Sequence, residues 1–444
     1  MFYFLLYLVI FLITSVVFLI IYLLRRRNKI IPIDDIGLVF SVFIALYTIL
    51  PIISWLLQGG RYILPIGRLY SLQPTVYEVL ELSLIGLCYI LGVLSIYLYS
   101  VKGLGILQRS PILIHPSLWV SNKLMFISAF MYIAGFTTLL LIRYKYNVYE
   151  AQSYNETYIA YLNIPKNIAQ VLNVLKGLVS MFYLVFLTGL FMRWSNKRSR
   201  ILIVFLFLFP FIMFEVGYSR AYLFQTIILF TLLFHLFVTP IKSLKIIFAS
   251  GMVLLVVFLL LGIRGSGAIS EQFIMPLGEF DVIWGNAVQM LREKNQEILS
   301  VPFYVYLYEF VAFIPSNILP FTKASHSSWL MDTYYPVAKA EGGGLMFGAI
   351  AQSVIGFGMV EAFIRGIIIG FVSLKFKSWL RIYKYSWRIL ILYLILYLSI
   401  PSMARGSTLA PLFLIIGSPL VALFLLSMLE KILPSKGNIQ KIIK

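Results

Sequence analysis

Residues 2–24 of the chain are FYFLLYLVIFLITSVVFLIIYLL, and Arg25, Arg26, Arg27 and Lys29 follow directly. An apolar helix of about 20 residues is long enough to cross the hydrocarbon core of a bilayer. The run lacks a basic segment in front of it and is longer than the apolar core of a signal peptide, so we expect a retained helix. The basic cluster behind it predicts that this end faces the cytoplasm and that the N-terminus lies outside.

The composition of the whole chain agrees with that first segment. Of the 444 residues 61% are hydrophobic and 12% are charged, and the mean hydropathy is +0.94. Soluble domains carry roughly a quarter charged residues. Because lipid offers no hydrogen bonds to the backbone, long apolar runs predict an all-α, polytopic transmembrane helical bundle. The short alternating segments of a membrane β-barrel do not dominate anywhere.

Apolar runs between charge clusters predict about 11 membrane-spanning helices. The spans are expected at residues 2–24, 37–57, 79–100, 119–142, 170–192, 201–216, 222–238, 246–263, 345–374, 389–402 and 408–429. Lys and Arg are denser in the loops that would then be cytoplasmic, which predicts an external N-terminus and a cytoplasmic C-terminus. The run 345–374 is also long enough for a re-entrant turn followed by a helix.

The net charge of +19 does not predict a nucleic-acid partner, because the basic residues form short clusters between apolar runs. The only cysteine, Cys88, lies inside an apolar run. An intramolecular disulfide and a thiolate metal site are therefore excluded, and we expect no cofactor.

We expect residues 1–444 to form a single integral membrane domain in which 264–344 is a large external loop with interfacial helices. This segment is the one long polar stretch and holds most of the external acidic residues, so function is expected there. Its part 303–320 is aromatic and apolar but is interrupted by Pro315, which favours a helix lying on the membrane surface.

Three arginines stand at predicted external helix ends, where the charge bias of membrane proteins disfavours them. Arg220 follows Gly217, Tyr218 and Ser219; Arg264 precedes Gly265; and Arg405 precedes Gly406 and Ser407. A guanidinium binds phosphate through two parallel hydrogen bonds, so converging arginines would hold a diphosphate, with Tyr218 beside them. The alternative is that each arginine reaches lipid headgroups or caps helix carbonyls.

Candidates for a catalytic base are carboxylates of the external loop. Glu341 precedes Gly342, Gly343 and Gly344, whose backbone amides would approach an anion at a helix start. Glu279 is a second candidate. The alternative for the glycines is a flexible turn before a packed helix.

Three other polar positions have both functional and structural interpretations. Asp281 and Glu309 are further external carboxylates that would ordinarily be solvated. His326 is the only histidine predicted outside, and a lone loop histidine is usually ordinary surface. His115 and His235 fall in other segments, so we expect no histidine-cluster metal site.

Glu361 and Arg365 are spaced four residues apart within a predicted span, and we expect a structural ion pair between them. The predicted external loop 144–161 holds several tyrosines. Their rings suit sugar faces, but tyrosine is also enriched at any bilayer interface.

On these residues the chain resembles the bacterial oligosaccharide repeat-unit polymerases, the Wzy or O-antigen polymerase family, including its enterobacterial common antigen branch. The likeness covers the general layout of the chain. It is specific in a few segments, which are Gly217–Tyr222, Arg264–Gly267, Leu277–Asp281, Tyr308–Pro320, Gly342–Gly358 and Met403–Ser407.

The resemblance implies a metal-independent glycosyltransferase of the bacterial inner membrane whose site faces the periplasm. Such an enzyme transfers a growing glycan from undecaprenyl diphosphate to an incoming lipid-linked repeat unit. Arg220, Arg264 and Arg405 would stabilise the departing diphosphate. Some relatives place a histidine where this chain has Glu341. A chain-length regulator protein and a flippase are the implied partners, besides the bilayer and the lipid-linked oligosaccharide.

Two other functions remain open from the sequence. A ligase that moves finished glycan from the same carrier would share the arginine clamp. A flippase or transporter of lipid-linked saccharides would line its central helices with charges, and the predicted spans hold few of them.

Overall fold

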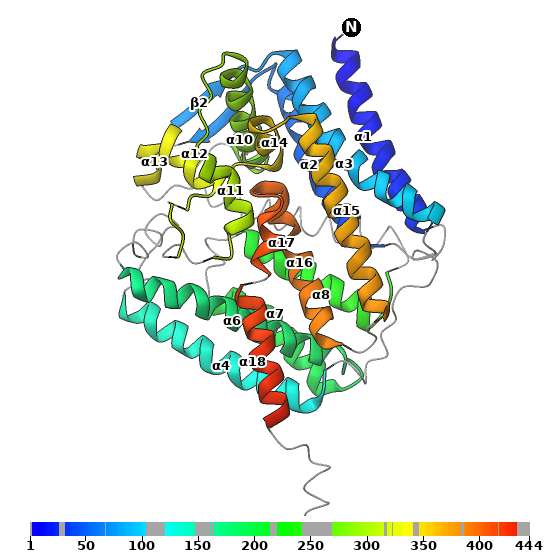
Figure 1. Ribbon diagram of the computed structural model, residues 1–444, viewed down its shortest axis with the longest axis vertical. Coiled ribbons are helices and arrows are strands. Elements are labelled where there is room, and N and C mark those ends of the chain that lie inside the picture. The colour runs from blue at the N-terminus through cyan, green and yellow to red at the C-terminus, as the bar shows by residue number, and fades with distance from the viewer. Residues whose placement is uncertain are drawn as a thin grey trace, which may run out of the picture. The chain divides into compact units, whose positions relative to one another are not determined.

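The computed structural model describes residues 2–25, 32–66, 68–103, 120–146, 160, 164–213, 220–241, 269–314, 318–321, 323–340, 346–382, 386–415 and 417–432. These residues form helices and one β-hairpin (Figure 1). The elements are α1 (Phe2–Arg25), α2 (Ile36–Leu57), β1 (Tyr62–Ile66), β2 (Arg68–Leu72), α3 (Val76–Gly103), α4 (Asn122–Lys145), α6 (Lys166–Phe191), α7 (Lys197–Met213), α8 (Arg220–Phe237), α10 (Ile269–Asn295), α11 (Phe303–Val311), α12 (His326–Tyr334), α13 (Pro336–Ala340), α14 (Ala349–Ile355), α15 (Met359–Ile382), α16 (Trp387–Arg405), α17 (Ala410–Leu414) and α18 (Ser418–Ile432).

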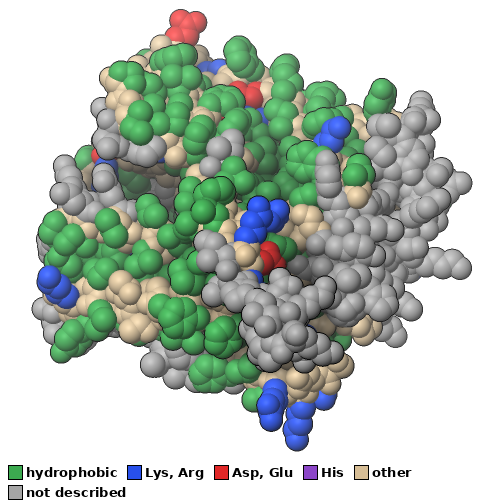
Figure 2. Space-filling view, turned by 60° about the horizontal axis from the view of Figure 1, so that its bottom comes forward, with side chains coloured by type: hydrophobic (Ala, Val, Ile, Leu, Met, Phe, Trp, Pro, Cys, Tyr) green, Lys and Arg blue, Asp and Glu red, His purple; other side chains and the backbone are tan. Residues whose placement is uncertain are grey.

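Seven helical segments among the described residues are long and apolar enough to cross a membrane. They lie in α1, α2, α3, α4, α6, α16 and the stretch Ala410–Lys431. Hydrophobic side chains cover much of the face drawn in Figure 2, as expected where lipid replaces water around a protein. The prediction of a polytopic helical bundle is confirmed, and the chain is a multi-pass membrane protein.

The remaining predicted spans differ in form. The helix α7 has 17 residues and α8 has 18. The predicted span 246–263 lies outside the described residues. The run 345–374 is not one continuous helix, because the seven-residue helix α14 ends at Ile355 and the 24-residue helix α15 begins at Met359. The hairpin of β1 and β2 was not predicted.

The predicted external loop 264–344 is helical over most of its described part. The helix α10 alone has 27 residues, and Asp281 to Val288 are all buried. The aromatic stretch 303–320 begins with α11, which ends at Val311 before Pro315.

The chain divides into two compact units. Unit 1 comprises residues 1–111, 241–379 and 396–413, and unit 2 comprises 112–240, 380–395 and 414–444. The candidate site belongs to unit 1.

Within unit 1, a hydrogen bond links α10 to α2 near the proline inside α2. Pro51 lies inside α2, and because proline has no N–H, the carbonyl of Tyr47 lacks its helical donor. The indole Nε1 of Trp284 in α10 donates to that carbonyl at 2.5 Å. Trp284 is fully buried, so this hydrogen bond fixes α10 against α2.

Two glycines bring α3 and α15 into backbone contact in unit 1. A Cβ at Gly92 would lie 2.2 Å from the carbonyl oxygen of Phe363, and a Cβ at Gly366 would lie 2.1 Å from that of Tyr89. Small residues at membrane helix crossings allow this approach. The crossing sets the position of Tyr89, which contacts the site described below.

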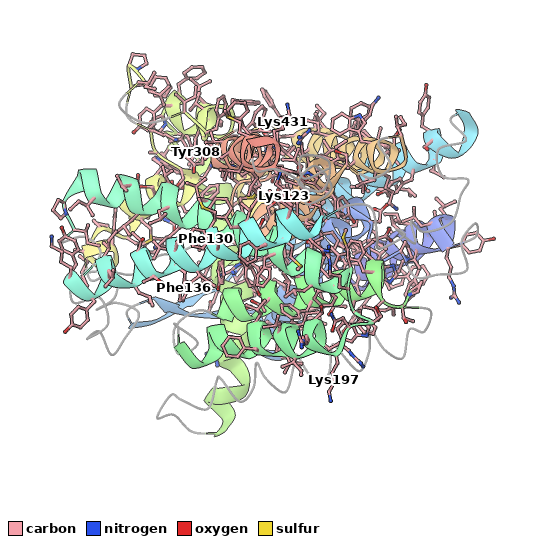
Figure 3. The ribbon with its side chains drawn as sticks, turned by 90° about the horizontal axis from the view of Figure 1, so that it is seen from below. Lys123, Phe130, Phe136, Lys197, Tyr308 and Lys431 are labelled. Atoms are coloured by element: carbon pink, nitrogen blue, oxygen red, sulfur yellow. The ribbon has the colours of Figure 1, made fainter. Side chains whose placement is uncertain are left out.

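Within unit 2, α4 and α6 run side by side (Figures 1 and 3). Leu139 of α4 and Leu172 and Val179 of α6 are buried between them. Phe130, labelled on α4 in Figure 3, is 64% exposed in the isolated chain. We interpret such exposed aromatic side chains as lipid-facing.

Candidate functional site

A buried ion cluster links α11 to α15. Nη1 of Arg365 lies 2.7 Å from Oε2 of Glu309, and Nη2 lies 2.6 Å from Oε1 of Glu361. The side chains of Arg365 and Glu309 are only 12% and 1% exposed. The predicted Glu361–Arg365 pair is therefore confirmed, and Glu309 is an additional partner that compensates the buried cation.

The same cluster reaches the turn that follows α16. The backbone N–H of Leu409 donates to Oε1 of Glu309 at 2.7 Å. One residue earlier, the N–H of Thr408 donates to Oε1 of Gln352 at 3.0 Å, and its hydroxyl donates to the same atom at 3.1 Å. Two successive amides of the turn are thus held by side chains of α11 and α14.

Tyr89 of α3 fixes α14 from the other side. Its hydroxyl donates to the carbonyl of Ala349 at 3.0 Å and lies 2.8 Å from Oγ of Ser353. Tyr89 is fully buried, and its backbone lies at the glycine crossing of α3 and α15. That crossing therefore positions the hydroxyl beside α14.

Arg405, the last residue of α16, lies at the end of the glycine-rich segment. Its carbonyl accepts the N–H of Gly348 at 2.8 Å. Gly348 has φ +92°, a conformation that favours glycine. The preceding residues are also fixed, because Ser327 Oγ accepts from the N–H of Phe347 at 3.2 Å and Asn286 donates to the carbonyl of Met346 at 3.0 Å.

His326 lies inside this arrangement as the first residue of α12. Its Nδ1 is 3.1 Å from Oγ of Ser407, and its Nε2 is 3.3 Å from Nε2 of Gln352. The ring stacks on Phe347 with centroids 5.5 Å apart. His326 is 2% exposed, so the expectation of an ordinary surface histidine was wrong.

Burial and nearby charges determine the protonation of these groups. Burial raises the pKa of Glu309, but Arg365 and the Leu409 amide outweigh that effect and hold it below its usual range. Burial lowers the pKa of His326 to about 4, with Glu309 opposing and Arg365 assisting. At neutral pH Glu309 is therefore ionised and His326 is uncharged.

A separate buried carboxylate, Asp281 of α10, lies against α2. Its Oδ2 accepts from Ser54 at 2.7 Å and from Gln58 at 3.2 Å. Burial raises the pKa of Asp281 to about 6, although both hydrogen bonds oppose the shift. The expectation of a solvated carboxylate was wrong for Asp281, as it was for Glu309, because tertiary packing covers both side chains.

The structure describes only some of the predicted site residues. Arg405 is partly exposed at the end of α16. Arg220 begins α8 in unit 2 and Glu279 lies in α10, but their side chains are outside the described part. Five predicted residues lie outside the described residues altogether: Tyr218, Arg264, Glu341, Gly342 and Gly343.

Sequence reasoning did not predict the roles of Gln352, Thr408, Ser407 and Tyr89. A signal was present for Gln352, because a lone amide inside the apolar run 345–358 has to find hydrogen-bond partners. Within the described residues no group of three or more His, Cys, Asp or Glu side chains is arranged to hold a metal ion.

No protein-family model, no curated protein and no solved structure matches this chain. The arrangement itself is a buried polar network in which Gln352 and Glu309 bind the backbone of the turn that begins with the partly exposed Arg405, Gly406 and Ser407. Such a turn presents hydrogen-bond donors, and it suits an anionic group better than a cationic one.

Proposed function

We propose that the chain is a glycosyltransferase that polymerises undecaprenyl-diphosphate-linked oligosaccharide repeat units at the outer face of the bacterial inner membrane. The observation that most supports this proposal is that segments distant in sequence meet in unit 1. Two of the segments on which the family resemblance rests are joined in unit 1 by the hydrogen bond from Gly348 to Arg405, and Glu309 of a third segment accepts from Leu409, two residues after Ser407. These segments are far apart in sequence, and their convergence on a single turn is what an assembled site requires.

In the proposed reaction a sugar hydroxyl of the incoming repeat unit attacks the anomeric carbon of the growing glycan. A new C–O bond forms, the bond from that carbon to the diphosphate breaks, and undecaprenyl diphosphate leaves. Arg405 would stabilise the charge that develops on the diphosphate. The hydroxyl proton passes to a carboxylate base.

Glu341 is the base that we propose. Glu309 is ionised, but it is 1% exposed and engaged by Arg365 and Leu409. Both ring nitrogens of His326 have partners. Glu341 stands seven residues before Gly348 in the sequence, directly after α13, and the end of that segment is held against Arg405.

The test is a reconstituted assay with purified protein, a synthetic undecaprenyl-diphosphate repeat unit and a metal chelator, resolved on a gel. We expect a ladder of lengthening glycans that the Glu341→Gln variant does not make. Glu297→Gln changes an exposed glutamate and serves as the matched control. Unchanged substrate from folded wild-type protein would refute the proposal, and transfer to another acceptor or flipping without growth would identify a ligase or a flippase.

A further inference from the structure

The polarity of one hydrogen-bond chain in the site can be deduced from its first donor. The backbone N–H of Thr408 can only donate, so the atom of Gln352 that it meets at 3.0 Å is the amide oxygen. The other end of the amide, Nε2, is therefore a donor. It faces Nε2 of His326 at 3.3 Å, which must accept.

This assignment fixes the tautomer of His326. Its burial and lowered pKa leave the ring uncharged at neutral pH, so it carries a single proton. Because Nε2 accepts from Gln352, that proton is on Nδ1. Nδ1 then donates to Oγ of Ser407 at 3.1 Å.

Ser407 is therefore left with a hydroxyl proton that cannot point towards His326. Within the described residues, its Oγ has no hydrogen-bond partner other than the histidine. Ser407 is partly exposed and stands two residues after Arg405 on the turn that Glu309 and Gln352 immobilise. Its hydroxyl proton is thus available for an acceptor outside the buried network.

We propose that Ser407 donates this hydrogen bond to a phosphate oxygen of the anion that Arg405 binds. The identity of that anion as undecaprenyl diphosphate rests on the proposed function. The network Thr408–Gln352–His326 has a positioning role. A serine hydroxyl can donate or accept, and because His326 donates to Ser407, the hydroxyl proton of Ser407 is directed towards the ligand. Two donors on one turn, a guanidinium and a hydroxyl, form a site for a phosphate-type anion.

The tautomer is tested without any ligand. The chain has 3 histidines, so selective ¹⁵N-histidine labelling gives a spectrum simple enough to assign with a His326→Gln variant. We expect His326 to be neutral and protonated on Nδ1 between pH 6 and 8. A proton on Nε2, or a charged ring, would overturn the assigned hydrogen-bond chain from Thr408 through Gln352 and His326 to Ser407.

The ligand is tested by calorimetric titration in detergent with undecaprenyl diphosphate, inorganic pyrophosphate and phosphatidylglycerol. Because a hydrogen bond to a charged group is worth about tenfold in affinity, Ser407→Ala should weaken binding of undecaprenyl diphosphate by about that factor. Ser407→Thr keeps the hydroxyl and should bind nearly as wild type. Ser402→Ala removes an exposed hydroxyl of α16 and should change nothing.

The variant His326→Gln distinguishes a hydrogen-bonding role of His326 from a role in packing alone. A glutamine amide can accept from Gln352 and donate to Ser407, so binding should be largely kept, whereas His326→Phe should weaken it as Ser407→Ala does.

The outcomes separate the two proposals. If Arg405→Ala weakens binding and Ser407→Ala does not, the role of Ser407 is refuted while the proposed function stands. If Ser407→Ala weakens phosphatidylglycerol binding by the same factor as binding of undecaprenyl diphosphate, the donor role stands and a diphosphate is not the specific ligand. If wild-type protein binds none of the three anions, both proposals fail.

Discussion

Arg365 and Glu309 form an ion pair with Nη1 and Oε2 2.7 Å apart, and the glutamate is almost completely withdrawn from solvent. The pair joins α15 to α11, and through Leu409 it also holds the turn after α16. Removing one partner of such a pair leaves an uncompensated buried charge.

We therefore predict that Arg365→Met lowers the free energy of unfolding by about 3–5 kcal/mol, measured by thermal unfolding in detergent. Arg198→Met, which changes an exposed arginine of unit 2, should alter it by less than about 0.5 kcal/mol. Adding Glu309→Gln to Arg365→Met should recover part of the loss, because it removes one of the two orphaned charges. Equal stability of Arg365→Met and wild type would show that the pair carries no net stabilisation.

A second prediction concerns Trp284 and the carbonyl of Tyr47. Trp284→Phe keeps the ring volume approximately but leaves that buried carbonyl unpaired, at a cost of about 1–3 kcal/mol. In a Pro51→Ala background the new N–H of residue 51 can pair with the same carbonyl, so Trp284→Phe should cost less there. The double-mutant cycle measures the difference. Additive effects would mean that the indole hydrogen bond is not coupled to the proline.

Local patterns in the sequence were sufficient for the fold class and for one part of the site. The Glu361–Arg365 pair followed from spacing within one helix, and the length of 345–374 allowed for the break that lies between α14 and α15. Both are short-range features, which periodicity and composition encode directly.

The rest of the site depends on contacts between distant segments. Nothing near His326 in the sequence indicates that Phe347 covers it or that Gln352 is its partner. The sequence around Glu309 does not indicate its ion pair, because Arg365 belongs to the distant helix α15. Sequence reasoning therefore identified candidate residues but not the network that determines their charge.

A third prediction concerns the pH dependence of stability at Asp281. The pKa of this buried carboxyl is raised to about 6, whereas an unfolded aspartate titrates near 3.9. Between these values the unfolded chain ionises first, so stability falls as pH rises from about 4 to 6 and then stays constant, with a total loss of about 3 kcal/mol.

Asp281→Asn removes this titration but can still accept from Ser54 and Gln58. Its unfolding free energy should lack the decline between pH 4 and 6 that wild type shows, and it should exceed that of wild type at pH 7.5. The measurement is denaturant unfolding at a series of pH values. Parallel curves for the two proteins would show that Asp281 does not titrate as its burial implies.

The last prediction concerns the geometry of the anion site at Arg405. Lysine keeps the charge but cannot make the two parallel hydrogen bonds of a guanidinium. If Arg405 binds diphosphate through that fork, Arg405→Lys should slow glycan elongation at least tenfold in the reconstituted assay, because a bidentate charged contact contributes more than about 1.4 kcal/mol. Arg198→Lys, on the exposed surface of unit 2, should elongate at the wild-type rate. Ladders of equal length and rate from Arg405→Lys and wild type would refute bidentate binding of diphosphate by Arg405. They would leave Arg405 as a charge that any cation at the end of α16 could replace.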